Sequence, residues 1–309
     1  MIALDTSVPR TAPQTNEVEG IRGRYADLWR AIDELLERIG THDWSRRHGK
    51  DWTFGDVPFH LAYFDAEIVC QPIERRHPTA DLVHAPLMGS MREMDAWNAR
   101  HFRERPAGQT PEHSLAQMRA SRAQVRALLD SVSDAELDQR VWIPLIGCGW
   151  VPLRFGLLSG IGHTWSHFIQ LRRYLGTPAE ADVTADTTHK AIGMFVSLLP
   201  VGLDRAAAAR LKAPFTAALE FSGPGGGCWV VRVTPDGQCR VDEEPAPRDA
   251  ALTLRQTPQT FELMRVDMAN PLWLLLSSQI KIRGFAALGT FGKLFPKPGL
   301  DTPIKPLSS

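Results

Sequence analysis

Two histidines four positions apart are the first residues of this sequence that could do chemistry. His163 and His167 lie in an otherwise mostly apolar segment, residues 160–176, which reads GIGHTWSHFIQLRRYLG. On a helix, side chains four positions apart share one face at about 6 Å, so both imidazoles could reach a single metal ion. Two histidines at this spacing can also be ordinary core residues whose ring nitrogens are hydrogen-bonded within the protein. A metal site therefore needs a third ligand from elsewhere in the chain.

His60 is the best-placed third histidine. It lies between the apolar residues Phe59 and Leu61 in a segment with helical character, residues 56–69. Three neutral imidazoles bind a borderline divalent ion, for which we expect Zn²⁺, with Ni²⁺ or Fe²⁺ as alternatives, and they leave a coordination position open. An open position can take a thiol and lower its pKa, which gives a nucleophile at neutral pH.

The composition excludes several other classes of protein. The chain has 309 residues with 35 basic and 35 acidic side chains, and a chain without net charge is unlike a nucleic-acid-binding protein. Its four cysteines form no C-x-x-C motif, which fits a reduced compartment better than a disulfide scaffold. The sequence shows no secretory signal and no membrane span. We expect a cytoplasmic protein that acts on a small molecule, and its oligomeric state stays open.

Apolar residues at spacings of three and four predict four long helices in the first half of the chain. The first covers residues 17–40, and the second begins after Thr53 as its N-cap. The third covers residues 110–132 with Thr110 as N-cap, and the fourth is the histidine segment. A shorter helix is expected at residues 91–102. Four helices of this kind favour a bundle. Within the last helix, Gly156 and Gly160 precede the histidines on one stripe, and we expect these small residues to leave room for a ligand.

The pattern changes after a polar segment, residues 176–189, which predicts a linker. A helix is expected at residues 190–200, followed by strands at 215–222, 228–234, 238–243, 249–256 and 280–284. Pro-Asp-Gly predicts a hairpin between the second and third of these strands, and Thr257 and Asn270 each precede a proline that begins a helix. An apolar stripe over residues 285–294 predicts a last helix. The second half should be a sheet with helices on one side.

The helical half resembles a known family. Its second helix, DWTFGDVPFHLAYFDAE, and its last, HTWSHFIQLRRYLG, resemble those of DinB-like four-helix bundles, which include mycothiol-dependent maleylpyruvate isomerases and thiol S-transferases. The segment MDAWNARHF is similar to a piece found in the isomerases. That superfamily takes one metal ligand from the second helix and two from the last. The resemblance thus implies His60, His163 and His167, although the isomerases tend to have Glu where His163 stands.

The second half resembles sterol carrier protein type 2 domains. The similar segments are GCWVVRVTPDGQCRV, DAALTLRQTPQTF and IKIRGFAALGTFGKLF. The isomerases also join a metal-binding bundle to a carrier-like domain. The resemblance implies an N-terminal DinB-like four-helix bundle, residues 1–178, followed by a sterol-carrier-like α+β domain, residues 186–309.

The resemblance also suggests residues beyond the metal ligands. The isomerases use an arginine from the C-terminal domain, for which Arg283 is the candidate here. Arg172 and Arg173 are candidates for binding a carboxylate of the thiol cofactor, although cations near a helix C-terminus are common. Asn98 is a further cofactor-binding candidate, and a solvated surface position is favoured for both Asn98 and Glu67. For Trp229 and residues 271–276, a core position is favoured over a lipid tunnel.

Two functions from different classes follow. The first is a metal-dependent enzyme that uses a low-molecular-weight thiol such as mycothiol, either for S-transfer or for thiol-assisted isomerisation of a small electrophile. The alternative is a non-catalytic binding protein that holds an apolar ligand in its C-terminal domain and uses the metal only as a brace. An apolar cavity in that domain, well away from the metal, would favour the alternative.

Overall fold

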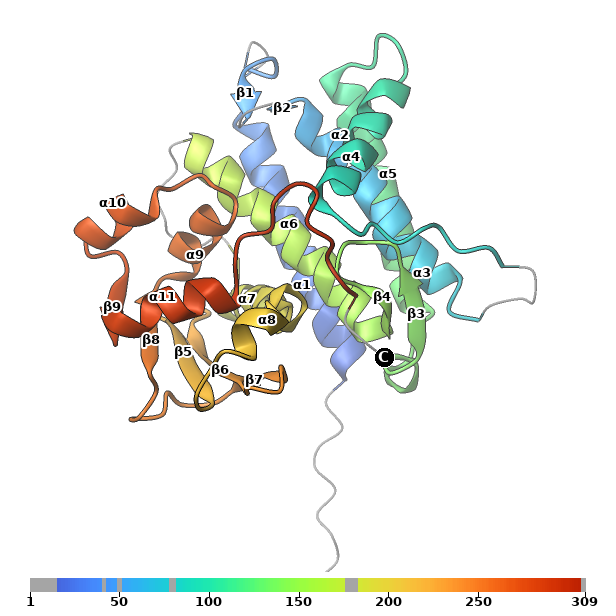
Figure 1. Ribbon diagram of the computed structural model, residues 1–309. Coiled ribbons are helices and arrows are strands. Elements are labelled where there is room, and N and C mark those ends of the chain that lie inside the picture. The colour runs from blue at the N-terminus through green and yellow to red at the C-terminus, as the bar shows by residue number, and fades with distance from the viewer. Residues whose placement is uncertain (1–15, 41–42, 49–51, 78–81, 176–182, 307–309) are drawn as a thin grey trace, which may run out of the picture.

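The chain folds into a helical N-terminal part and a C-terminal sheet flanked by helices (Figure 1). This computed structural model describes residues 16–40, 43–48, 52–77, 82–175 and 183–306. The expected long helices are confirmed, together with the shorter one, which is α4. Their bounds are α1 Glu17–Glu37, α2 Asp56–Phe64, α4 Met91–Glu104, α5 Pro111–Asp130 and α6 Leu153–Leu175. None of the described helices has the length and apolarity that crossing a bilayer requires.

Helix α1 shows why the periodicity was informative. Ile21, Tyr25, Leu28 and Ile32 recur at spacings of three and four, and each is fully buried on the face that meets the bundle. Helix α5 begins as its sequence indicates, because the Thr110 hydroxyl accepts a hydrogen bond from the backbone N–H of His113. Local sequence thus determines both the buried face and the start of these helices.

Helix α2 begins later than expected. Thr53 is not its N-cap, because Trp52–Thr53 forms strand β2, paired with β1 Arg47–His48, and the cap position falls to Gly55. Thr53 instead donates from its backbone N–H and its hydroxyl to the carboxylate of Asp56. The helix continues as a π-helical segment, η1 Asp65–Cys70, and ends in α3 Gln71–Glu74. This change of helical pitch was not predicted.

A second hairpin, also not predicted, leads into α6. Strand β3 Arg140–Ile143 pairs antiparallel with β4 Gly149–Pro152, so that Val141 lies opposite Val151. It follows a short 3₁₀ turn, η2 Asp134–Glu136. The strands are too short to show a clear alternation in sequence, but their buried valines fix where α6 starts.

The predicted linker is only partly described. Residues 176–182 lie outside the described part of the chain, and the proposed domain boundary between residues 178 and 186 stays a prediction. Residues 185–189 are not linker, because α7 Ala185–Ser197 begins there, with the Thr184 hydroxyl accepting from the backbone N–H of Thr187. The polar composition of this segment is that of a helix N-terminus with its cap.

The C-terminal sheet has five strands in the order β7-β6-β5-β8-β9, and only the β5–β8 pair is parallel. The Pro-Asp-Gly hairpin between β6 and β7 is confirmed, with Gly237 at φ +81°. Trp229 is buried against Phe221, which supports its core position. The core position expected for residues 271–276 is wrong for most of that run, because Leu272, Trp273 and Leu276 are exposed and only Leu274 is buried there. The bounds are β5 Phe215–Phe221, β6 Gly227–Val233, β7 Cys239–Glu243, β8 Leu252–Gln256 and β9 Lys281–Arg283.

Helix α6 also packs against the helices of the C-terminal part. It contacts α7 and α9, and the Ser166 hydroxyl on α6 donates to the carboxylate of Glu262 on α9. The same buried apolar cluster includes residues of both halves, such as Trp165 and Ile192. The remaining elements are η3 Leu199–Gly202, α8 Arg205–Ala208, α9 Pro258–Arg265, α10 Pro271–Leu276 and α11 Phe285–Leu294.

Gly156 and Gly160 do not leave room for a ligand, so this expectation is wrong. A Cβ atom at Gly160 would collide with the Tyr25 hydroxyl of α1 and with Val69 of η1, and one at Gly156 would collide with Ile143 of β3. Tyr25 cannot easily move, because it is fully buried and donates to the backbone carbonyl of Leu157. These glycines instead allow α6 to approach its neighbours closely.

We predict that Gly160→Ala destabilises the protein although alanine favours a helix. Overpacking against Tyr25 should lower the free energy of unfolding by about 1–3 kcal/mol, as for other added methyl groups in packed cores. Gly23→Ala is the matched control, because Gly23 also lies within a helix but has open space at its Cβ position. The control should raise the free energy of unfolding by up to about 1 kcal/mol. Urea denaturation measures both, and equal effects would contradict the packing role.

Candidate metal site

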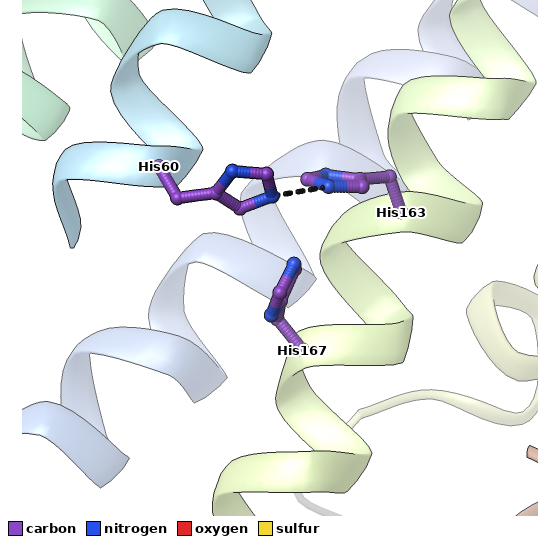
Figure 2. A group of neighbouring side chains, drawn as sticks. All are labelled: His60, His163 and His167. Atoms are coloured by element: carbon purple, nitrogen blue, oxygen red, sulfur yellow. Dashed lines mark hydrogen bonds between the residues drawn. The ribbon is translucent and has the colours of Figure 1, made fainter. Parts of the chain in front are cut away.

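The three predicted histidines meet between α2 and α6. The Nε2 atoms of His60 and His163 lie 2.8 Å apart, and His167 approaches them from one turn further along α6 (Figure 2). One ring nitrogen from each residue lies within 4.8 Å of the others. His60 and His167 are buried and His163 is half-buried. Helical spacing supplies the α6 pair, and the packing of α2 against α6 supplies the third imidazole.

Aromatic side chains hold the three rings in place. The ring of Phe64 stacks on His163 with centroids 3.5 Å apart, and Trp52 stacks on His167 at 5.9 Å. Trp52 also contacts the ring of His60 at 4.4 Å. Burial, and after it the positive charge of Arg265, lower the pKa of His163 to about 3. His163 is therefore neutral at physiological pH, as a metal ligand must be.

Tyr63 determines which nitrogen of His60 carries the proton. The single phenolic hydrogen of Tyr63 is donated to Oδ1 of Asn98, at 2.6 Å. The Tyr63 oxygen also lies within hydrogen-bond distance of His60 Nδ1, so Nδ1–H must be the donor there. This leaves the lone pair of His60 Nε2 facing the other histidines. Burial, followed by the charge of Glu67, raises the pKa of Tyr63 well above its ordinary value, so the phenol keeps its proton.

Helix α4 holds Tyr63 in turn. The Tyr63 ring stacks on His101 at 4.1 Å, and Glu67 accepts from the indole N–H of Trp97 at 2.8 Å and lies 3.2 Å from His101. Glu67 and Asn98 are thus not solvated surface residues. Both are partly buried and take part in this network beside the histidines. A ligand histidine whose second nitrogen is held in this way is typical of metal sites.

The donor set fits a divalent ion. Imidazole nitrogens suit Zn²⁺ and its neighbours in the transition series, and Zn–N bonds of about 2.0–2.1 Å place tetrahedral ligand atoms roughly 3.4 Å apart. Small shifts of the three rings would bring their nitrogens to that separation.

With His60 protonated on Nδ1, the contact between the two Nε2 atoms requires a proton on Nε2 of His163. The Nδ1 atom of His163 is buried with no hydrogen-bond partner within the described residues.

A cavity of about 340 Å³ opens beside the histidines. Its lining includes Asn98 and one arginine, Arg265 of α9. The Arg265 guanidinium donates to both carboxylate oxygens of Glu262, at 2.8 and 2.7 Å, and to the Ser166 hydroxyl at 3.0 Å. Its guanidinium carbon also lies 3.9 Å from the centre of the Phe195 ring. The C-terminal part of the chain therefore contributes a cation to the site.

The three predicted arginines do not line this cavity. Arg172 is buried with its guanidinium carbon 5.2 Å from the Phe168 ring centroid, and Arg173 lies at a separate cavity between α6 and the C-terminal part. Arg283 binds the Thr253 hydroxyl and the carbonyls of Pro247 and Arg248 at the edge of the sheet. Sequence reasoning missed Arg265. Its only local signal is the acidic residue three positions earlier, Glu262, because such a spacing allows an ion pair on one helical face.

Comparisons with known proteins agree with the helical fold. The sequence model of the DinB superfamily matches residues 24–171. A crystal structure of the mycothiol-dependent maleylpyruvate isomerase matches with a TM-score of 0.45 and 12% identity, covering 79% of this chain and 87% of that chain. A mutant of that isomerase matches with a TM-score of 0.48 and 10% identity, covering 92% and 96%.

The C-terminal part has a weaker counterpart. Apo sterol carrier protein 2 from Yarrowia lipolytica matches with a TM-score of 0.26 and 15% identity, covering 34% of this chain and 91% of that chain. No curated protein matches the sequence. The sterol-carrier likeness of the C-terminal part stays a prediction. The helical region, residues 24–171, which is just under half of the chain, is thus similar to the DinB superfamily.

Proposed function

We propose that the protein is a metal-dependent enzyme that uses a low-molecular-weight thiol as nucleophile on a small electrophilic substrate. His60, His163 and His167 would hold one divalent ion, with Zn²⁺ favoured by the donor set. When bound, the ion would supply the positive charge that favours a thiolate over a thiol. The observation that carries the proposal is the convergence of three imidazoles, two of them buried and one half-buried, next to a cavity in the described part of the chain.

The protein's own residues supply the remaining requirements. Structural zinc sites are usually closed by four protein ligands, whereas three leave a position for a substrate or cofactor. The apolar lining of the cavity keeps water away from the ligand position and strengthens electrostatic interactions there. Arg265, held by its ion pair with Glu262, is the arginine of the C-terminal part that would serve the reaction, a role for which Arg283 was the candidate. Mycothiol is the thiol that the family resemblance suggests, and S-transfer or isomerisation are the reactions.

The alternative, a carrier of apolar ligands, has less support. Two cavities of the C-terminal part lie away from the histidines, with volumes of about 620 and 560 Å³, and the second is lined by charged residues such as Arg205 and Asp236. The larger one is the better candidate for a ligand. Its lining includes Arg173, Arg255 and Lys281 together with several amide and hydroxyl side chains. The more apolar cavity is the one beside the histidines. This distribution favours an enzyme site over a remote lipid cavity.

We predict one divalent ion per chain and its loss in the double variant His60→Ala, His163→Ala. With Co²⁺ in place of the natural ion, a bound thiol should add a sulfur-to-metal charge-transfer band to the absorption spectrum.

His167→Ala should abolish turnover and leave the C-terminal part folded, because that part has its own buried residues. Metal analysis, absorption spectroscopy and circular dichroism provide the measurements. If the protein binds no stoichiometric ion, or if its Co²⁺ spectrum does not change with any cellular thiol, the carrier function is favoured.

A second prediction concerns the orientation of His60. Tyr63→Phe removes the acceptor for His60 Nδ1–H and should weaken metal binding by about 10- to 100-fold, as for other residues that orient metal ligands. Asn98→Ala should weaken it as well, because the Tyr63 hydroxyl can then donate to Nδ1 and leave the proton on Nε2. Chelator competition measures the metal affinity, and long-range ¹H–¹⁵N NMR of the metal-free protein identifies the tautomer.

Tyr174→Phe is the matched control for these variants. Tyr174 also carries a phenol but packs on Phe54 with ring centroids 6.4 Å apart, outside the Tyr63–Asn98 pair. It should leave the metal affinity and the His60 tautomer unchanged. If Tyr63→Phe and Tyr174→Phe bind metal equally well, the orienting role of Tyr63 is wrong, and this result leaves the three histidines as metal ligands untouched.

A further inference from the structure

The polar side chains of the cavity beside the histidines are already bonded within the protein. Asn98 Oδ1 accepts from Tyr63, and the Ser159 hydroxyl donates to the backbone carbonyl of Gly156 at 2.7 Å. The Ser166 hydroxyl donates to Glu262 and accepts from Gln170 and Arg265. Besides the histidines, the amide N–H groups of Asn98 are therefore the main hydrogen-bonding groups left for a ligand among the described lining residues.

The charge of Arg265 is also compensated. It makes a two-point ion pair with Glu262, whose side chain is fully buried. A bidentate pair of this kind uses both carboxylate oxygens and fixes the plane of the guanidinium. No other Lys or Arg and no Asp or Glu lies among the lining residues. The side chains of the lining thus offer no uncompensated cation to an anionic substrate, and the only other cation would be the ion on the three histidines.

The remainder of the lining is apolar and adaptable. A volume of about 340 Å³ is near the lower end of the range for small-molecule sites, roughly 300–1,000 Å³. Methionine side chains in the lining can adjust to ligands of different shape. The apolar side chains that line the cavity are Trp52, Phe64, Met91, Met94, Trp97, Leu145, Ile146, Phe155, Met194, Phe195 and Leu198.

We propose that the substrate bound beside the histidines is an uncharged, largely apolar molecule, alkyl or aromatic, that carries its electrophilic carbon toward the metal site. The inference rests on the proposed function for the position of that carbon. A carboxylate or phosphate placed among the apolar lining residues, away from the metal position, would lose its hydration without gaining a free cation in return, which opposes binding. The pair of Glu262 and Arg265 is therefore the feature that selects against anions.

A matched pair of probes tests this selection. Benzylacetone and hydrocinnamate have nearly the same size and shape, but a methyl ketone in the first replaces the carboxylate of the second. With the protein kept metal-free, so that the carboxylate cannot coordinate an ion, we expect benzylacetone to bind at least about tenfold more tightly, because the carboxylate has to be desolvated. Methyl NMR of ¹³C-labelled methionine measures both affinities. Met91, Met94 and Met194 line the cavity and should shift, whereas the core residue Met118 should not.

Removing the compensating charge should reverse the preference. In Glu262→Gln, Arg265 keeps its charge without its partner, so hydrocinnamate should gain about tenfold in affinity while benzylacetone changes little. The double variant Glu262→Gln, Arg265→Met has neither charge and should prefer benzylacetone again. This variant keeps the test valid if the single variant fails to fold. Glu244→Gln is the control, because Glu244 pairs with Arg232 at the sheet, and it should behave like the unaltered protein.

Three results would overturn the inference. Hydrocinnamate could bind the unaltered protein as tightly as benzylacetone, benzylacetone could fail to shift the three cavity methionines, or the preference could survive Glu262→Gln unchanged. None of these measurements requires a thiol or turnover. A protein that binds benzylacetone in this cavity but no metal ion would contradict the proposed function and leave the ligand class standing.

Discussion

The close approach of α6 to α1 and η1 at Gly160 is the contact on which the site depends. Because Gly160 has no side chain, the Tyr25 hydroxyl and Val69 pack directly against the α6 backbone. His163 follows less than one helical turn later, and His167 follows His163 by about one turn. The depth at which α6 lies in the bundle therefore sets the distance between its two imidazoles and His60. Residues that touch no ligand thus determine whether three nitrogens can share one ion.

Helix α2 contributes more to the site than His60. Phe64 of α2 and Trp52 of the preceding strand β2 contact the imidazoles with their rings, and Tyr63, which donates to Asn98, orients His60. Directly after Phe64 the helix widens into η1, the kind of local π-helix that occurs at functional sites. Glu67 lies in this segment and meets Trp97 and His101 of α4. Helix α4 is therefore a support for the site and not only a connection between α2 and α5.

The C-terminal part completes the cavity. Met194, Phe195 and Leu198 come from α7 and its end, and Arg265 comes from α9. The ion pair between Glu262 and Arg265 reaches α6 through Ser166, only one residue before His167. A bundle without this part would lack one wall of its cavity and its only lining arginine. The helical part and the C-terminal part therefore form this cavity together.

The sequence by itself determined the local features of this protein. Apolar periodicity located the long helices, proline after Thr110 or Thr257 located two helix starts, and helical spacing placed His163 and His167 on one face. His60 was found from its position between Phe59 and Leu61 in a helical segment, and its resemblance to one position of a family motif supported the choice. All of these depend on residues a few positions apart, where backbone geometry alone fixes the neighbours.

Only the tertiary structure decided which distant residues meet. Arg265 rather than Arg283, Arg172 or Arg173 lines the cavity, and Gly160 serves helix packing instead of ligand space. Asn98 reaches His60 through Tyr63, across a gap of 35 residues between Tyr63 and Asn98. No local pattern encodes such contacts, because they depend on the depth and angle at which helices pack, and those follow from the fit of many side chains at once.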